Sequence, residues 1–334
     1  MTLIDSTFTN VPVGILSAWT TSSQPPSSGS LVIENLSLNN VPVVIRGPSG
    51  TILAGATGST TITAWGQGHR YTPNGPSNAQ GAIAANPRPA VLQGGGGNRW
   101  YARSKPQYEH LGRSDFVSAR SAGARGDGVV DDTAALQAAL DAAAAANKVL
   151  WIDYGLYRLT STLTIPPGSR VVGEAYPVLM SSGAFFADQS RPQPVVRVGS
   201  VSGQPGHVEL SDFVVGTQGA QAGAVLIQWN LLTPGQPSGM WDVHTRIGGF
   251  AGSQLQAADC PKRPGDSSVT PRCIGAYMSM HVTKAASNLY MENTWIWTAD
   301  HDLDDGANTQ ITVFAGRGLC KSRKGLVVSP AEVS

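Results

Sequence analysis

Charge is scarce in this chain and almost balanced. Lysine and arginine together number 23 and aspartate and glutamate 22, so the net charge is +1 and only 13% of residues are charged. A chain without a basic surplus lacks the electrostatic attraction that binds nucleic acid or an anionic membrane surface. We therefore expect neither nucleic acid nor a membrane as a partner.

Long apolar runs are also missing. No segment approaches the roughly 18 consecutive apolar residues that cross a bilayer. Residues 1–5 (MTLID) have neither the basic start nor the apolar core of a secretion signal. We predict no membrane span and no signal peptide in this sequence.

Cysteine is limited to three residues, which is too few to settle the redox compartment. Cys260 and Cys273 flank a loop that is rich in proline and charge, where a local disulfide would restrain an otherwise irregular excursion. We predict a possible disulfide between these two. Cys320 is left over and is expected to be a packed or chain-end thiol.

Glycine and proline are abundant instead, at 39 and 22 residues, and 41% of the chain is apolar. This composition is typical of a loop-rich β protein with ample material for a packed core. The length of 334 residues allows one large domain or two of medium size.

An internal repeat opens the chain. Residues 3–13 (LIDSTFTNVPV) align with residues 33–43 (IENLSLNNVPV) at an offset of 30. Such a period is typical of one coil of a solenoid, with alternating apolar positions inside and Asn10 and Asn40 stacked at a corner. We interpret residues 1–64 as the last coils of a first β-helix.

An aspartate-rich turn and a helix begin the second part, at residues 123–137 (GARGDGVVDDTAALQ). Gly126 and Gly128 permit a tight turn, and an alanine-rich segment near residues 133–147 predicts a short helix that caps a β-solenoid. Turn and cap chemistry is favoured over a metal or acid site for the aspartates of this segment. These aspartates are Asp127, Asp131 and Asp132.

Short strand-like runs broken by glycine and proline follow the helix. They span residues 162–165, 170–172, 195–198, 207–215, 224–229, 273–281, 286–297 and 309–314. A β-sandwich would also give short strands, but it would not predict the capping helix. The predicted fold is thus all-β, with parts of two tandem right-handed parallel β-helices. Residues 65–118 are expected to form a long linker, residues 119–319 the N-terminal part of the second β-helix, and residues 320–334 an aberrant tail.

Several strings follow one another in a recognisable order: residues 4–6, 10–15, 64–69 (AWGQGH) with Tyr71, 104–108 (SKPQY), the aspartate-rich turn with its helix, 292–304 (ENTWIWTADHDLD) and 316–319 (GRGL). Together they resemble one family, the fungal and bacterial exo-β-1,3-glucanases of glycoside hydrolase family 55. The resemblance implies two tandem β-helices with a β-1,3-glucan cleft between them. It also implies inverting hydrolysis without a cofactor, an extracellular location and a monomeric intact protein.

The departures from this family pattern concern length and the catalytic carboxylates. The family's enzymes are about twice as long, and their catalytic glutamates lie on coils that have no counterpart in this sequence. We therefore expect an internal fragment, inactive alone, with no catalytic residue carried over onto it.

One acidic and aromatic cluster carries the candidate site. It consists of Glu292, Trp295, Trp297, Asp300, His301 and Asp302, followed by Asp304 and Asp305. Three interpretations stay open: loop residues that bond the backbone, the lining of a sugar cleft, and a Ca²⁺ site, although no metal is assigned. Alternation along a strand would place both tryptophans on one face.

Two further sets are weaker candidates. Packing and surface roles are favoured for Trp241, Asp242, His244 and Arg246, whereas Trp65, Gln67 and His69 could face the cleft between the β-helices. Two alternative functions are a pectin-active lyase or hydrolase and a non-catalytic, tailspike-like carbohydrate-binding β-helix.

Overall fold

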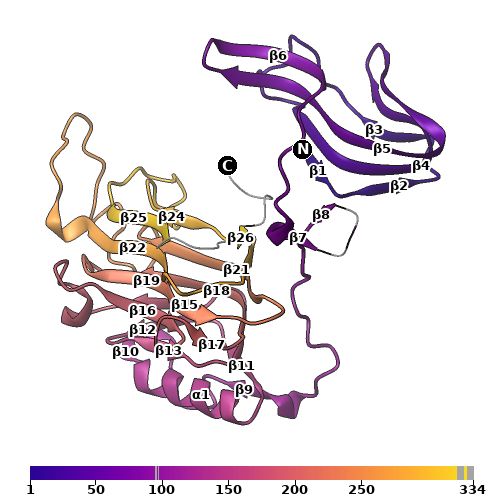
Figure 1. Ribbon diagram of the computed structural model, residues 1–334. Helices are drawn as coiled ribbons and strands as arrows, with labels where there is room; N and C mark the ends of the chain where they lie inside the picture. Colours follow the sequence, from indigo (N-terminus) through magenta and orange to yellow (C-terminus); the bar gives the residue numbers. More distant parts are fainter. Residues whose placement is uncertain (95, 97, 322–326, 329–334) are drawn as a thin grey trace. The chain divides into compact units, whose positions relative to one another are not determined.

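A computed structural model describes residues 1–94, 96, 98–321 and 327–328 of the chain (Figure 1). The fold divides into two compact units, Met1–Ala102 and Arg103–Ser334. Each unit has a hydrophobic core of its own, and each is described by itself.

The first unit begins with the predicted pair of coils. Strands β1 (Thr2–Ile4), β2 (Thr7–Thr9) and β3 (Val13–Leu16) all pair in parallel with the long strand β4 (Leu31–Gly47). The register is that of the sequence repeat, since Phe8 lies opposite Leu38 and Ile15 opposite Ile45. The parallel coil arrangement is therefore confirmed.

Short polar side chains form the corners of these coils. Asp5, Asn10, Asn35 and Asn40 all have φ between 52° and 55°, the left-handed conformation that Asn and Asp tolerate better than most residues. The Asn35 amide donates to Asp5 at 2.6 Å and the Asn40 amide to Asn10 at 2.9 Å, so the corners stack from coil to coil.

The remainder of the first unit departs from a solenoid. Strand β4 pairs in antiparallel fashion with β5 (Gly50–Thr72), and β5 pairs likewise with β6 (Gly75–Ala82), so regular structure continues into the segment expected to be a linker. Two-residue turns explain the change: Gly47 lies opposite Gly50, and Thr72 lies opposite Gly75. Such turns join antiparallel strands and cannot connect parallel ones. The helical turn η1 (Ala90–Leu92) and the strands β7 (Gln93–Gly94) and β8 (Arg99–Trp100) complete the unit.

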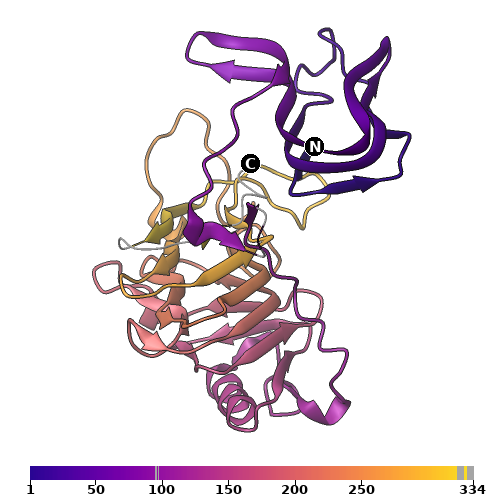
Figure 2. The ribbon, with the colours of Figure 1, turned by 45° about the vertical axis from the view of Figure 1, so that its right-hand side comes forward.

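The second unit is a parallel β-helix, as predicted (Figure 2). Its strands stack in register from coil to coil along two large parallel sheets. The first sheet contains β9 (Phe116–Ser118), β10 (Asp127–Asp131), β11 (Val149–Ile152), β12 (Leu156–Leu159), β14 (Arg170–Gly173), β15 (Val178–Ser181), β18 (Glu209–Thr217), β21 (Ser238–Ile247), β23 (Leu289–Glu292), β24 (Ile296–Thr298) and β26 (Val327–Val328). The second contains β13 (Leu163–Ile165), β16 (Gln193–Val198), β19 (Ala224–Trp229), β22 (Ile274–Val282) and β25 (Phe314–Lys321). The short strands β17 (Gln204–Pro205) and β20 (Leu231–Leu232) pair in parallel with each other. The unit also contains the helical turns η2 (Arg113–Asp115), η3 (Ala184–Phe186) and η4 (Pro271–Cys273).

Helix α1 (Thr133–Ala145) covers the first coil, as the alanine-rich segment predicted. Its buried face includes Leu136 and Leu140, which join the core of the β-helix. The Gln137 amide donates to the Thr164 carbonyl and its oxygen accepts from the Thr164 N–H, so the helix also satisfies the edge of β13. At 13 residues α1 is too short to cross a bilayer, and no helix in the described part of the chain meets that requirement.

The aspartates before α1 serve the turn. Asp132 is 1% exposed and accepts from the backbone N–H groups of Arg125 and Gly126, while Asp131 accepts from the Thr133 N–H. This is the turn chemistry that the sequence favoured for them.

A disulfide joins Cys260 and Cys273, whose Cα atoms lie 5.9 Å apart. Both cysteines are buried, and the exposed loop between them projects from the β-helix. Cys320 is a free thiol in β25.

Candidate functional site

A polar corner runs up one side of the second unit. Asp212, Asp242 and Asn293 lie on successive coils, each with φ between 51° and 63°. Asn293 donates to Asp242, and the Lys105 ammonium donates to both Asp212 and Asp242 at 2.8 Å. Although burial alone would lower it, the bonds to both carboxylates raise the pKa of Lys105 above its ordinary value.

The segment around Lys105, residues 103–108, is held along the β-helix at several points; we call it the anchor segment. The Arg103 guanidinium pairs with Glu209 and lies 5.0 Å from the Trp241 ring, whose indole N–H donates to the Arg103 carbonyl. The Tyr108 hydroxyl also donates to Glu209, at 2.6 Å. The string SKPQY is thereby explained as structural, because its side chains attach the chain to β18 and β21.

A row of aromatic rings lies beside this corner. It comprises Tyr176, His244, Trp295, Trp297 and His301, and we call it the aromatic stripe. Tyr176 and His244 have ring centroids 5.4 Å apart, and the backbone N–H of Trp295 donates to His244 Nδ1 at 3.0 Å. Trp295 and Trp297 stack at 4.8 Å with an interplanar angle of 18°. Trp297 then meets His301 edge-on at 5.3 Å.

The stripe is open to solvent at two of its rings, with Tyr176 44% and Trp295 46% exposed. Arg246 lies on the neighbouring coil, opposite Trp297, with its guanidinium carbon 5.9 Å from that ring. Burial lowers the pKa of Arg246 below its ordinary value. Asp300 accepts from His301 Nδ1 at 2.6 Å, and its side chain is 69% exposed. The stripe thus combines flat apolar faces with one exposed carboxyl group.

The other acidic residues of the cluster are used by the loops themselves. Asp302 is 2% exposed and accepts from the Gln256 amide and from the backbone N–H groups of Ala257 and Asp304. These bonds match the interpretation of Asp302 as a loop residue that bonds the backbone. Glu292 accepts from the Tyr290 hydroxyl at 2.6 Å.

Neighbouring acidic residues have the same role. Asp304 accepts from the Ala251 N–H, and Asp305 accepts from the N–H groups of Ala307 and Thr309. Among the described residues, no group of three or more His, Cys, Asp and Glu side chains has a metal-binding arrangement, so the Ca²⁺ interpretation gains no support.

The residues of the two weaker candidate sets have different environments. Trp241 is 1% exposed beneath the anchor segment, whereas His244 and Arg246 belong to the stripe and its border. In the first unit Trp65 and Gln67 are buried, and the Gln67 amide donates to the Ser17 hydroxyl and the Gly29 carbonyl.

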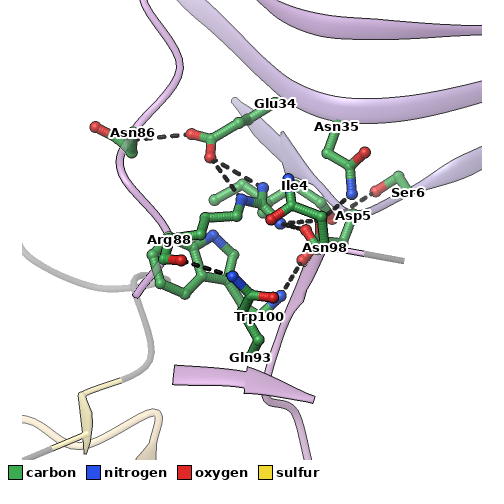
Figure 3. A network of polar contacts seen from close by, with 10 residues as sticks. All are labelled: Ile4, Asp5, Ser6, Glu34, Asn35, Asn86, Arg88, Gln93, Asn98 and Trp100. Atoms are coloured by element: carbon green, nitrogen blue, oxygen red, sulfur yellow. Dashed lines mark hydrogen bonds and ion pairs between the residues drawn. The ribbon is translucent and has the colours of Figure 1, made fainter. Parts of the chain in front are cut away.

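The first unit also holds a buried charged cluster that the sequence did not reveal (Figure 3). Arg88 pairs with Asp5 at 2.6 Å and with Glu34 at 2.9 Å, and its guanidinium carbon lies 5.0 Å from the Trp100 ring. The backbone N–H of Trp100 donates to Asp5, and the Asn86 amide donates to Glu34. Because every charged group of the cluster is paired, the cluster is structural: it attaches Asn86, Arg88 and Trp100 to the first coil.

Sequence comparison identifies the relatives of the chain. Residues 116–230 match the family model described as rhamnogalacturonase A/epimerase, pectate lyase-like. A glucan 1,3-beta-glucosidase of Cochliobolus carbonum is 51% identical over 95% of this chain and 40% of its own length. A probable glucan endo-1,3-beta-glucosidase of Arthroderma benhamiae is 44% identical over 75% of this chain and 28% of its own length.

The chain is thus similar to these glucan glucosidases over most of its own length. The resemblance to the β-1,3-glucanases that the sequence strings predicted is thereby confirmed. The chain is also 34% identical, over 97% of its length, to the non-secreted LysM effector LysM15 of Penicillium expansum, of which it covers 23%. The chain thus spans less than half the length of the relatives it matches.

Two sets of candidate residues that the sequence analysis treated separately form one surface. His244 and Arg246 meet Trp295 and Trp297 because they lie on adjacent coils, but here the offset is 51 rather than the 30 that separates Val208 from its partner Ser238. The loop enclosed by the disulfide lengthens this coil. If the segment between the two cysteines had been left out of the sequence before the coils were aligned, the pairing of His244 and Arg246 with Trp295 and Trp297 could have been found.

Proposed function

We propose that this chain forms the glucan-binding part of an inverting exo-β-1,3-glucanase and that the aromatic stripe is where it binds the polysaccharide. The observation that carries the proposal is two aromatic pairs, Tyr176 with His244 and Trp295 with Trp297, joined by the hydrogen bond from the Trp295 backbone to His244. The names of the two glucosidase relatives support the choice of β-1,3-glucan.

The chemistry of the stripe suits a neutral sugar polymer. The C–H faces of pyranose rings pack against flat aromatic rings, whose electron-rich faces attract the slightly positive hydrogens. Sugar hydroxyls find polar partners at the border, where Asp300 and Arg246 lie. The stripe crosses several coils, so a polymer can contact it at successive sugar units.

Hydrolysis with inversion requires two carboxyl groups about 6.5–9.5 Å apart on either side of the scissile bond. In the cluster, Asp302, Asp304 and Asp305 accept from backbone N–H groups, whereas Asp300 bonds to the His301 ring and its side chain is 69% exposed. We propose that the catalytic glutamates belong to the part of the whole protein outside this chain, which spans 40% of the length of its Cochliobolus relative. The isolated chain then binds glucan and hydrolyses it little.

We further propose that the whole protein acts outside the cell as a monomer. It uses neither a metal nor an organic cofactor.

Binding to laminarin, measured by affinity electrophoresis, tests the proposal. Trp295→Ala should weaken binding roughly tenfold, the equivalent of about 1.4 kcal/mol for one lost aromatic surface. Tyr154→Ala, which removes an aromatic ring that is 65% exposed elsewhere on the second unit, is the matched control and should bind normally. Equal binding by both variants would refute the role of the stripe, and glucose release at the rate of a full-length relative would refute the predicted inactivity.

A pectin-active enzyme is the second candidate, because residues 116–230 match the rhamnogalacturonase and epimerase family model. Lyase action on pectate with Ca²⁺ would give an unsaturated product that absorbs in the ultraviolet. The glucanase proposal predicts no such product.

A further inference from the structure

A cavity of the second unit lies away from the stripe, at the first coil of the β-helix. It has a volume of about 710 Å³ and lies between η2, β9 and the turn that follows β9. Trp151 of β11 and Phe116 of β9 form an aromatic corner in it, with ring centroids 6.4 Å apart and planes at 80°. Figure 1 shows β9 beside α1 at one end of the solenoid, whereas β24, which carries Trp297, is near the other end.

Three hydrogen-bond donors in this cavity have no partner in the described part of the chain. They are the Arg113 guanidinium, the Trp151 indole N–H and the Ser121 hydroxyl. Arg113 and Ser121 are exposed and Trp151 is half-buried, so all three are within reach of a ligand. By contrast, the Ser118 hydroxyl at the same site is committed to Asp153.

This combination is what small-molecule sites use: a concave space of several hundred Å³ with an aromatic surface and a few fixed polar groups. An indole with its N–H unpaired offers a face for a sugar ring and a donor for a sugar hydroxyl at its edge. The arginine and the serine add donors beside the ring. A purely apolar ligand would leave these three donors unused.

We propose that the cavity is a second carbohydrate site, which holds a short β-1,3-linked glucose oligosaccharide with one pyranose ring stacked on Trp151. The identity of the sugar rests on the proposed function, but the site does not, because it shares no residue with the stripe. Such a site would hold the polymer to the protein at a second point along its length, and two linked contacts bind a polymer more tightly than either alone.

Fluorine NMR on the whole chain labelled with 5-fluorotryptophan can observe both sites in one titration. The chain has eight tryptophans, and the signals of Trp151 and Trp295 are assigned with Trp151→Phe and Trp295→Phe. Added laminaritriose should shift the Trp151 signal along a saturable curve. Arg113→Gln should raise the dissociation constant at this site roughly fivefold, about 1 kcal/mol.

The control is Arg125→Gln, which removes another exposed arginine outside the cavity and should leave the curve unchanged. A Trp151 signal that stays still while the Trp295 signal moves would overturn the second site and leave the proposed function intact. If Trp295 alone fails to respond, the stripe is refuted and the cavity stands. A Trp151 shift that Arg113→Gln does not weaken would overturn the assignment of the ligand to this cavity.

Discussion

At the residue scale, Arg88 is the side chain on which the first unit depends most. It neutralises two acidic groups, Asp5 and Glu34, whose side chains are 15% and 5% exposed. Removing one partner of a buried ion pair leaves an unpaired charge with little access to water. Arg88→Met should therefore lower the free energy of unfolding of the first unit by about 3–5 kcal/mol, measured by denaturant titration.

Arg46→Met is the control for that substitution. Arg46 is exposed in β4 of the same unit, so its loss should change the unfolding midpoint little. If Arg88→Met is no more destabilising than Arg46→Met, the cluster contributes nothing to the fold.

The same cluster predicts a dependence on pH. Although burial alone would raise it, hydrogen bonds from Asn35 and Arg88 hold the pKa of Asp5 below its ordinary value. A depressed pKa stabilises the fold at pH values above the unfolded pKa, and this stabilisation is lost as the pH falls through the folded pKa. The midpoint of unfolding should thus decrease in acid below about pH 4, and Asp5→Asn should make this decrease shallower. An unchanged slope in Asp5→Asn would contradict the assignment.

The positions of some single residues could be predicted from the sequence, and those of others could not. The stacking of Trp295 and Trp297 on one face followed from strand alternation, and the corner asparagines followed from the repeat. The Arg88 cluster could not be inferred, because it joins residues 83 positions apart in sequence through an irregular segment with no period.

At the element scale, the loop that ends at Cys273 shows how one covalent bond shapes a coil. Its cysteines are 13 residues apart, and closing a loop of about that length removes roughly 3 kcal/mol of chain entropy from the unfolded state. The double variant Cys260→Ser/Cys273→Ser should therefore lower the unfolding midpoint of the second unit in denaturant. Cys320→Ser, which removes the free thiol, is the matched control. Equal midpoints for the two variants would show that the disulfide is dispensable.

Elements with a regular period were predictable, and those that depend on a turn were not. Strands β13, β14, β18 and β19 fall on runs that alternation and glycine spacing indicated, and α1 on the alanine-rich segment. The antiparallel hairpins of β4, β5 and β6 were missed, because each strand alone has the same alternation as a solenoid strand. The turn residues between Gly47 and Gly50 and between Thr72 and Gly75 carried the local signal.

At the scale of the whole molecule, the strings that resemble a family and the physical patterns in the sequence predicted different things. The turn, the helix and the repeat indicated stacked coils without indicating a substrate. The strings at residues 64–69 and 104–108 indicated the family, but their side chains are largely structural: Gln67 is buried and Lys105 bonds two corner aspartates. A specific string can therefore identify a relative while contributing no chemistry to the site.

Two separate cores predict two separate unfolding events. The apolar cluster around Ile33 and Leu36 lies wholly in the first unit, and the cluster that contains Leu210 and Val243 lies wholly in the second. Compact units with their own cores unfold independently when few interactions couple them. Hydrogen exchange followed by mass spectrometry in increasing denaturant should show peptides of residues 1–94 and 116–320 losing protection at different midpoints. Arg88→Met should shift only the first midpoint, and the double cysteine variant only the second; a common shift in either variant would mean that the chain unfolds as one cooperative body.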